Sequence, residues 1–258
     1  MHRYFLELSY DGTPFKGWQV QDNGDTVQGE INKALTTLVG SETKCVGCGR
    51  TDSGVHALQF YAHFDSEIYF KDLRKFKHQL NGLLPHEISI IDAFESKDKG
   101  HTRFDATWRT YHYVISKGKN AFLKKYAHKV FIDLDVNAMN RAAKLLLKND
   151  DFETFCKKGS DTKTTLCDVR AAHWTENDQM YVFEISANRF LRGMVRAITG
   201  TLVKVGEGDM TVEQFEEVML AKDRQEAGSA LPAWGLFLSG VSYPYIAEHE
   251  PFQFFLGR

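Results

Sequence analysis

The sequence predicts an α+β protein made of two ferredoxin-like (RRM-like) units side by side, with a mixed, mostly antiparallel sheet, helices on one face and a basic cleft between the units. Three observations support this prediction. Strand alternation and helical periodicity follow each other as strand, helix, strand, strand, helix, strand, which is the βαββαβ pattern. The second half repeats the strand and helix theme without visible similarity to the first. A chain of 258 residues, 43% hydrophobic, can bury an ample core.

The first unit, residues 1–105, is expected to contain four strands and two helices. In chain order, these six elements are predicted at residues 3–10, 26–40, 44–46, 57–64, 72–84 and 88–94. Asp25, with Gln28 three residues later, is a plausible start for the first helix, and Gly40 is a typical end. Pro85 stops the second helix.

The second unit, residues 106–258, follows a boundary near residue 105 that no Pro- or Ser-rich linker marks. Strands are predicted at residues 107–116, 129–133, 167–174, 180–187 and 235–243. Helices are predicted at residues 135–148, at 189–205 and after Thr211, which forms a cap with Gln214. Arg189, Arg192 and Arg196 are spaced i, i+3 and i+7, so all three are expected on one face of the second of these helices.

Charge is unevenly distributed along the chain. The net charge of −2 gives no general nucleic-acid signal. Two runs, residues 106–132 and 186–206, contain no Asp or Glu; their basic residues are Arg109, Lys117, Lys119, Lys124, Lys125, Lys129, Arg189, Arg192, Arg196 and Lys204. The runs fit either a surface for an anionic partner or an ordinary solvated basic face.

Several classes of protein are not expected. The four cysteines include one C-x-x-C pair, Cys45 and Cys48, but no second close pair, so reduced thiols in a cytoplasmic protein are predicted rather than a metal site. The amino terminus lacks a signal-peptide core, and no apolar run approaches about 18 residues, so neither export nor membrane insertion is predicted. The sequence shows no nucleotide-loop, metalloprotease, hydrolase or kinase motif.

A glycine-rich loop at residues 47–57 is the strongest candidate for chemistry. Glycines surround Asp52 and its neighbour Arg50, and His56 follows just before strand alternation resumes. Glycine permits positive φ and the close approach of a ligand. The residues alone fit two interpretations: a carboxylate kept ionised by its cation for use as a nucleophile or base, or a tight turn in which Asp52 caps backbone N–H groups. His56 is expected to make a local hydrogen bond.

Five blocks of sequence resemble the tRNA pseudouridine synthase A family, in family order across nearly the whole chain. The blocks are YDGT, GWQ and TVQ within residues 10–28, GRTDSGVHA at 49–57, RTYHY at 109–113, FL and MVR within 190–196, and GLFL, V and YP within 235–244. Ser53 replaces the alanine that is usual in the second block. Together the blocks are highly specific, although each alone is weak.

The resemblance implies an isomerase that acts without a cofactor. Such an enzyme breaks the glycosidic bond of a uridine in tRNA and rejoins the ribose to C5 of the base. The resemblance further implies that the uridines lie in the anticodon stem-loop, around tRNA positions 38, 39 and 40, and that the enzyme is a cytoplasmic homodimer. The target base must be flipped out, because an aspartate cannot reach a stacked uridine.

The matched positions also imply site residues. The resemblance assigns Asp52 as the catalytic carboxylate, Tyr111 as the tyrosine that stacks on uracil and assists C5 deprotonation, and Arg196 as the arginine that pairs with the aspartate. RNA contacts are expected, besides Tyr111, from Arg50, Thr51, Arg189, Arg192, Lys117, Lys119 and Lys124. Without the resemblance, Tyr111 also fits a core ring and Arg196 a solvated helix face.

Two other functions are compatible with parts of the sequence. A non-catalytic RNA-binding protein of two ferredoxin-like units leaves the aspartate motif unexplained. A hydrolase or transferase with an aspartate nucleophile and a small phosphorylated substrate needs a metal-binding pattern that the sequence lacks. Neither accounts for all five blocks. The phenylalanine-rich segment 251–256 is expected to cover either a partner subunit or the core.

Overall fold

The computed structural model describes residues 1–96, 100–160 and 162–247, which form two compact units. Unit 1 contains Met1–Thr107 and the described residues from Leu238 onward, and unit 2 contains Trp108–Phe237. Most of the last strand therefore packs with the first unit, although its place in the sequence predicts that it belongs to the second. Each unit combines strands with helices, and most strand pairs are antiparallel, which confirms the predicted α+β class with a mixed, mostly antiparallel sheet.

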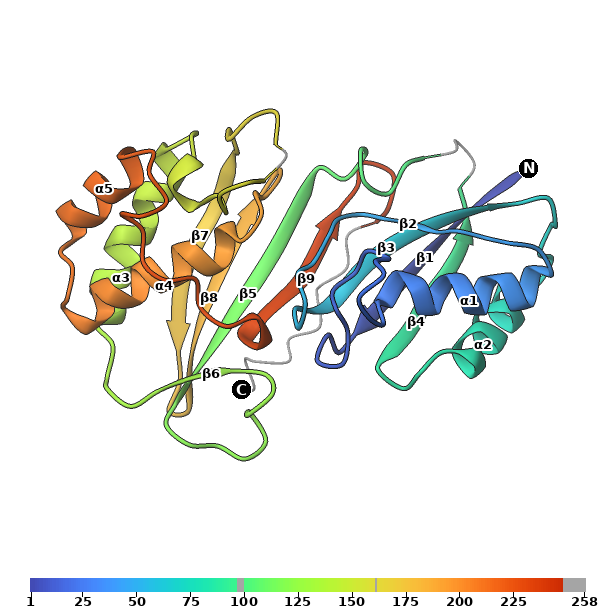
Figure 1. Ribbon diagram of the computed structural model, residues 1–258, viewed down its shortest axis with the longest axis horizontal. Helices are drawn as coiled ribbons and strands as arrows, with labels where there is room; N and C mark the ends of the chain where they lie inside the picture. Colours follow the sequence, from blue (N-terminus) through green and yellow to red (C-terminus); the bar gives the residue numbers. More distant parts are fainter. Residues whose placement is uncertain (97–99, 161, 248–258) are drawn as a thin grey trace. The chain divides into compact units, whose positions relative to one another are not determined.

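The sheet of unit 1 has the strand order β4-β1-β3-β9, and β2 pairs with β3 (Figure 1). β1 (His2–Tyr10) lies between β3 (His56–Ser66) and β4 (Ile88–Glu95) and is antiparallel to both. The short β2 (Val46–Gly47) is antiparallel to β3, and β9 (Leu236–Ser242) contributes its residues from 238 onward. The βαββαβ order predicted for this unit is confirmed.

Two helices of unit 1 pack against each other, and the second also packs on β4 (Figure 1). α1 (Val27–Val39) begins one residue later than predicted, because Thr26 rather than Asp25 is its N-cap. Its predicted end at Gly40 is confirmed, with a φ of 76° that favours glycine. α2 (Leu73–Leu83) ends before Pro85, as predicted.

Aromatic packing fixes the loop that follows β1. Trp18 of this loop stacks on Phe60 of β3 with 4.1 Å between ring centroids, and Tyr10 packs on both rings. All three residues are at most 4% exposed. Burial of one such ring contributes about 2 kcal/mol. The loop is therefore held on the sheet by the core itself.

The sheet of unit 2 has the order β5-β8-β7, with β6 parallel to β5 and the other described pairs antiparallel. Its strands are β5 (Trp108–Lys117), β6 (His128–Val130), β7 (Val169–Glu176) and β8 (Met180–Ala187). The helices α3 (Val136–Ala143), α4 (Met194–Glu207) and α5 (Val212–Leu220) pack on one another, α3 also on β7 and α4 also on β5 (Figure 1).

Two helix predictions in unit 2 have different outcomes. The helix predicted at 135–148 is α-helical only to Ala143 and continues as a 3-10 helix, Lys144–Lys148. The capping box of Thr211 and Gln214 is confirmed at the start of α5. Further 3-10 turns lie at Glu153–Phe155 and Ala233–Gly235.

The helix predicted at residues 189–205 is wrong at its beginning. α4 begins at Met194, and Gly193 before it has a φ of 73°, in the left-handed region that a regular helix does not contain. Arg189 and Arg192 therefore lie before the helix, and only Arg196 lies on it. The expectation that the three arginines share a helix face is corrected, because their spacing aligns side chains only within a continuous helix.

No helix in the described residues combines the length and hydropathy that spanning a bilayer requires. Within the same part of the chain, no cluster of three or more His, Cys, Asp or Glu side chains is arranged to hold a metal ion. The four cysteines are buried free thiols, and burial raises the pKa of Cys45 to about 12 and that of Cys167 to about 11. The segment 251–256 lies outside the described residues.

Candidate active site

Asp52 lies on a tight turn between β2 and β3 in unit 1, here called the Asp52 turn (residues 50–56). The Val55 N–H donates to the Asp52 carbonyl at 3.1 Å, and Gly54 takes a φ of 78°. The Ser53 hydroxyl donates to the Phe15 carbonyl at 3.1 Å. The turn is therefore tied both to itself and to the loop that follows β1.

Two glycines of that loop let it approach the Asp52 turn closely. A Cβ on Gly12 would stand 2.0 Å from the Val55 oxygen, and a Cβ on Gly17 would stand 2.6 Å from the Thr51 oxygen. Gly17 also has a φ of 93°, which residues with side chains rarely adopt. The Trp18 N–H donates to the Thr51 carbonyl at 3.2 Å. Backbone thus packs on backbone at this turn, and no side chain can separate the two.

His56 supports the turn from inside the protein. It is 1% exposed, and its Nδ1 lies 3.1 Å from the Gly12 nitrogen and 3.1 Å from Asp11 Oδ1. The sequence predicts a local hydrogen bond for His56, but the partners in the structure come from the loop after β1, more than 40 residues earlier in the chain. Because the ring is buried against the loop after β1, its contribution is to hold the two segments together.

The side chains of the turn differ in exposure. Asp52 is half-buried, Arg50 is exposed, and Thr51 is only 9% exposed. The Thr51 hydroxyl lies 2.9 Å from the Tyr10 phenol oxygen, so it faces the core of unit 1. A half-buried carboxylate on a backbone fixed in this way can act on a ligand without first losing conformational freedom.

Two tyrosines on β5 in unit 2 have different surroundings. Tyr111 is half-buried, and its ring meets Phe190 edge to face, with centroids 5.0 Å apart and planes at 86°. Tyr113 is fully buried, and its phenol donates to the Pro232 carbonyl at 2.8 Å. Burial raises the pKa of the Tyr113 phenol. Tyr113 is therefore a packing residue, whereas Tyr111 lies beside an aromatic ring at a partly accessible position.

Arg196 lies in the first turn of α4 and is bound to the segment that precedes the last 3-10 turn. Its Nε donates to the Leu231 carbonyl at 2.6 Å, and the Leu231 N–H donates to the Arg196 carbonyl at 3.1 Å. The Nε bond orients the guanidinium group, and the backbone bond holds Leu231 beside the first turn of α4. A fixed guanidinium suits a carboxylate or a phosphate, because its N–H groups match the two oxygens of either partner.

Known proteins resemble this chain over nearly its whole length. A family model described as tRNA pseudouridine synthase matches residues 142–244. The tRNA pseudouridine synthase A of Bacteroides thetaiotaomicron is 45% identical over 95% of this chain and 91% of its own length. The proteins of the same name from Parabacteroides distasonis and Caldicellulosiruptor bescii are 46% and 40% identical, over 95% and 94% of this chain and 97% and 100% of their own lengths. The chain belongs to the tRNA pseudouridine synthase A family.

The basic residues expected at RNA have unequal exposure in this family member. Lys119 and Lys124 are exposed on the loop between β5 and β6, and Arg192 is exposed before α4. The Lys117 ammonium lies 2.6 Å from a glutamate of β7 and over a tyrosine ring of β8. Arg189 is half-buried, and its guanidinium donates to a threonine hydroxyl at 3.3 Å. Lys119, Lys124 and Arg192 are therefore exposed to solvent, whereas Lys117 and Arg189 contact other side chains of the protein.

One exposed pair in unit 1 is missing from the predicted site residues. Arg103 and Phe104 lie in a turn between β4 and β5, and both are exposed. The available signal is the run from His101 to Asp105, in which a cation and an aromatic ring stand between polar residues that favour turns. The sequence does not reveal that this turn is anchored to the sheet, because Arg3 and His63, which anchor it, lie far from it in the chain.

Proposed function

We propose that the protein converts uridine to pseudouridine in the anticodon stem-loop of tRNA, around positions 38, 39 and 40. The observation that carries the proposal is the Asp52 turn, a half-buried carboxylate on a backbone that Gly12 and Gly17 allow to pack closely. Membership of the tRNA pseudouridine synthase A family, over nearly the full length of its relatives, supports the same reaction.

Asp52 is the proposed nucleophile. The reaction breaks the C1′–N1 bond of uridine, forms a C1′–C5 bond and, in net, moves a proton from C5 to N1. Since atoms and electrons balance within the uridine, the isomerisation needs no oxidant or reductant. An ionised carboxylate within bonding reach can attack the ribose, attack the base, or remove the C2′ proton to give a glycal. Each route requires the position of this carboxylate to be fixed.

Tyr111 and Arg196 are proposed to assist from unit 2. The Tyr111 ring is proposed to stack on uracil, and its phenol to help remove the C5 proton; its edge-to-face contact with Phe190 supports the stacking role. Arg196 is proposed to pair with the Asp52 carboxylate during the reaction. Its guanidinium, already oriented by Leu231, supports this role because arginine binds carboxylates through a planar fork.

Binding of the tRNA is proposed to depend mainly on phosphates and RNA shape, and therefore to weaken with salt. The exposed residues Arg50, Arg192, Lys119 and Lys124 are the proposed phosphate contacts. Thr51, Lys117 and Arg189 are proposed to contribute by holding their neighbours in place. The target uridine is flipped out of its stack before Asp52 reaches it. The resemblance further supports a cytoplasmic homodimer as the working form.

Tritium release from tRNA labelled at C5 of uracil tests the proposal, because the label leaves only when C5 bonds to the ribose. We expect release by the wild type and a loss of at least about 1,000-fold in Asp52→Asn, with tRNA binding retained. Ser53→Ala is the matched control beside Asp52 and is expected to release tritium at nearly the wild-type rate, because it loses one hydrogen bond of the turn but introduces the residue that is usual in the family.

Two results would contradict the proposal in different ways. Undiminished release from tRNA without uridine at positions 38, 39 and 40 would contradict the proposed location but not the reaction. No release by the wild type, despite tight tRNA binding, would instead indicate a non-catalytic RNA-binding protein.

A further inference from the structure

Phe104 exposes 76% of its surface in a turn whose conformation is closely controlled; residues 100–105 are here called the Arg–Phe turn. The ring of Phe104 packs on His101, with 4.3 Å between ring centroids and 32° between planes. The central guanidinium carbon of Arg103 lies 5.8 Å from the centroid of the same ring. The turn thus presents an apolar ring and a cation together.

Two side chains fix the Arg–Phe turn locally. His101 Nδ1 accepts the backbone N–H of Arg103 at 3.1 Å and that of Phe104 at 3.3 Å. The Asp105 carboxylate accepts the His101 N–H at 2.7 Å and the Tyr245 phenol at 2.9 Å. These hydrogen bonds lower the pKa of Asp105, so its carboxylate stays ionised. The backbone that carries the ring and the cation is therefore ordered before any ligand binds.

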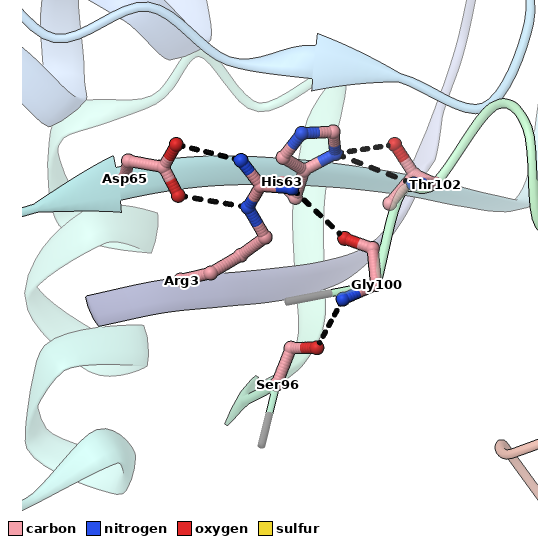
Figure 2. Close-up of polar contacts among 6 residues, drawn as sticks. All are labelled: Arg3, His63, Asp65, Ser96, Gly100 and Thr102. Carbon is pink, nitrogen blue, oxygen red and sulfur yellow. Dashed lines mark hydrogen bonds and ion pairs between the residues drawn. The ribbon is translucent and has the colours of Figure 1, made fainter. Parts of the chain in front are cut away.

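Figure 2 shows how the turn is anchored to the sheet of unit 1. Arg3 of β1 binds both Asp65 oxygens, at 2.8 and 2.7 Å, and donates to the Gly100 carbonyl at 3.2 Å. Thr102 is 0% exposed; its N–H donates to His63 Nδ1 at 3.3 Å, and its Oγ1 lies 2.8 Å from the same nitrogen. A buried network thus holds a turn whose most apolar side chain is left in solvent.

Core packing does not explain this arrangement, because Phe104 buries little of its own surface. Binding does explain it, since a turn ordered in advance avoids much of the entropy loss that binding otherwise costs. An aromatic ring accepts any base by stacking, and an arginine beside it binds phosphate. Both groups match a single unpaired nucleotide, and the anticodon arm offers unpaired bases.

We propose that the Arg–Phe turn is a tRNA-binding site of this chain in addition to the Asp52 turn. The Phe104 ring stacks on an unpaired base, and the Arg103 guanidinium binds an adjoining phosphate. This proposal rests on the proposed function, which supplies tRNA as the anionic partner. It assigns Arg103 and Phe104 to binding and gives them no part in bond breaking.

Equilibrium binding of unmodified tRNA tests the site. Phe104→Ala is expected to raise Kd about 5- to 100-fold, as the loss of one base–aromatic stack predicts, and Phe104→Trp to restore tight binding. Arg103→Gln is expected to weaken binding and to reduce the slope of log Kd against log salt by about one. Tyr69→Ala, which removes another aromatic ring of unit 1 that is 54% exposed, is the matched control and is expected to leave Kd unchanged.

The outcomes separate this site from the proposed function. At saturating tRNA, Phe104→Ala is expected to release tritium at the wild-type rate. An unchanged Kd for tRNA in Phe104→Ala would overturn the proposal of a binding site. If light scattering also shows a changed oligomeric state in this variant, Phe104 instead contacts another protein molecule. If the wild type binds tRNA but releases no tritium, the proposed function fails, and the Kd comparison still decides the binding site. If the wild type does not bind tRNA, both fail.

Discussion

The Asp52 turn and the Arg–Phe turn of unit 1 share a plan and differ in how they are held. Each is supported by a buried histidine, His56 or His63, whose Nδ1 lies within hydrogen-bonding distance of a backbone N–H. Each contains a buried threonine, Thr51 or Thr102. The Asp52 turn is held mainly by close backbone approach, whereas the Arg–Phe turn is held mainly by side chains, some within the turn and others from β1 and β3.

The difference fits two kinds of task. A reacting carboxylate must reach one atom of the substrate, and a displacement of about 1 Å can cost about 100-fold in rate. A ring that stacks on a base tolerates small shifts, because stacking accepts every base. We therefore expect substitutions in the Asp52 turn to change the rate of reaction and substitutions in the Arg–Phe turn to change the affinity for tRNA.

The largest effect among the predictions that follow is expected on β5, where a reacting and a supporting tyrosine lie two residues apart. Tyr111→Phe removes the phenol proposed to assist proton transfer and is expected to lower kcat about 100- to 1,000-fold with tRNA affinity unchanged. Tyr113→Phe deprives the Pro232 carbonyl of its donor and is expected to cost about 1–2 kcal/mol of stability with kcat unchanged.

Tritium release and urea unfolding measure the two tyrosine variants. A loss of kcat of the same size in both would contradict the separation of reacting from supporting tyrosines.

A second prediction breaks the backbone contact at the Asp52 turn. Gly17→Ala places a Cβ 2.6 Å from the Thr51 oxygen at a φ of 93°, so the turn must shift. We expect kcat to fall about 100-fold, with Kd for tRNA changed less than twofold. Gly49→Ala is the matched control, because a Cβ at Gly49 meets nothing within 4 Å. Activity in Gly17→Ala equal to that in Gly49→Ala would show that close backbone approach does not position the carboxylate.

The third prediction concerns stability and pH at the Arg–Phe turn. Burial lowers the pKa of His63 to about 4, from an ordinary value of 6.5. The unfolded chain therefore binds a proton below pH 6.5 that the folded chain does not, and stability falls as the pH falls from 6.5 to 4. The full loss from this residue is about 3 kcal/mol.

Urea unfolding at pH 7 and pH 4.5 checks the His63 prediction. His63→Gln is expected to reduce the pH dependence, and His78→Gln, at an exposed position on α2, is expected to preserve it. Part of the dependence is expected to remain in His63→Gln, because burial also lowers the pKa values of His101 and His128. An identical pH dependence of stability in the wild type and in His63→Gln would show that His63 does not cause the loss of stability at low pH.

The smallest effect is expected from loosening the anchor of the Arg–Phe turn without touching the turn itself. Arg3→Lys keeps the charge but cannot bind both Asp65 oxygens and the Gly100 carbonyl at once. We expect Kd for tRNA to rise about 2- to 3-fold with kcat unchanged. Arg74→Lys, at an exposed position on α2, serves as the control for the substitution. A fall in kcat for Arg3→Lys would contradict this prediction, because it would show that Arg3 affects the reaction step and not only the affinity for tRNA.

Signals that are complete within a few residues predict much of this fold. Gly40 ends α1, and Thr211 with Gln214 begins α5, because caps involve neighbours three or four residues apart. The Asp52 turn is similar, since its glycines and its aspartate are nearly consecutive. The matched motifs also name Tyr111 and Arg196, although they say nothing of the ring and the carbonyl that orient them.

Features that depend on distant partners are not visible in the sequence. The arginine spacing predicts a helix through Arg189 and Arg192. Because Gly193 has a left-handed backbone conformation, however, α4 begins only after it, at Met194. Likewise, a run such as His101 to Asp105 resembles any polar turn until Arg3 and His63 are brought to it by the pairing of β1 with β3. Such contacts require the folded sheet, and periodicity does not encode them.

The Asp52 turn is proposed to supply the chemistry, and the Arg–Phe turn is proposed to supply affinity for tRNA. Single-turnover tritium release, measured across enzyme concentrations for Asp52→Asn and Phe104→Ala, tests this division of roles between the two turns. We predict that Asp52→Asn binds tRNA like the wild type and releases tritium at least about 1,000-fold more slowly. Phe104→Ala is expected to reach the wild-type maximum rate, but only at enzyme concentrations about 5- to 100-fold higher. A reduced maximum rate in Phe104→Ala, or a loss of rate much smaller than about 1,000-fold in Asp52→Asn, would contradict the division between the two turns.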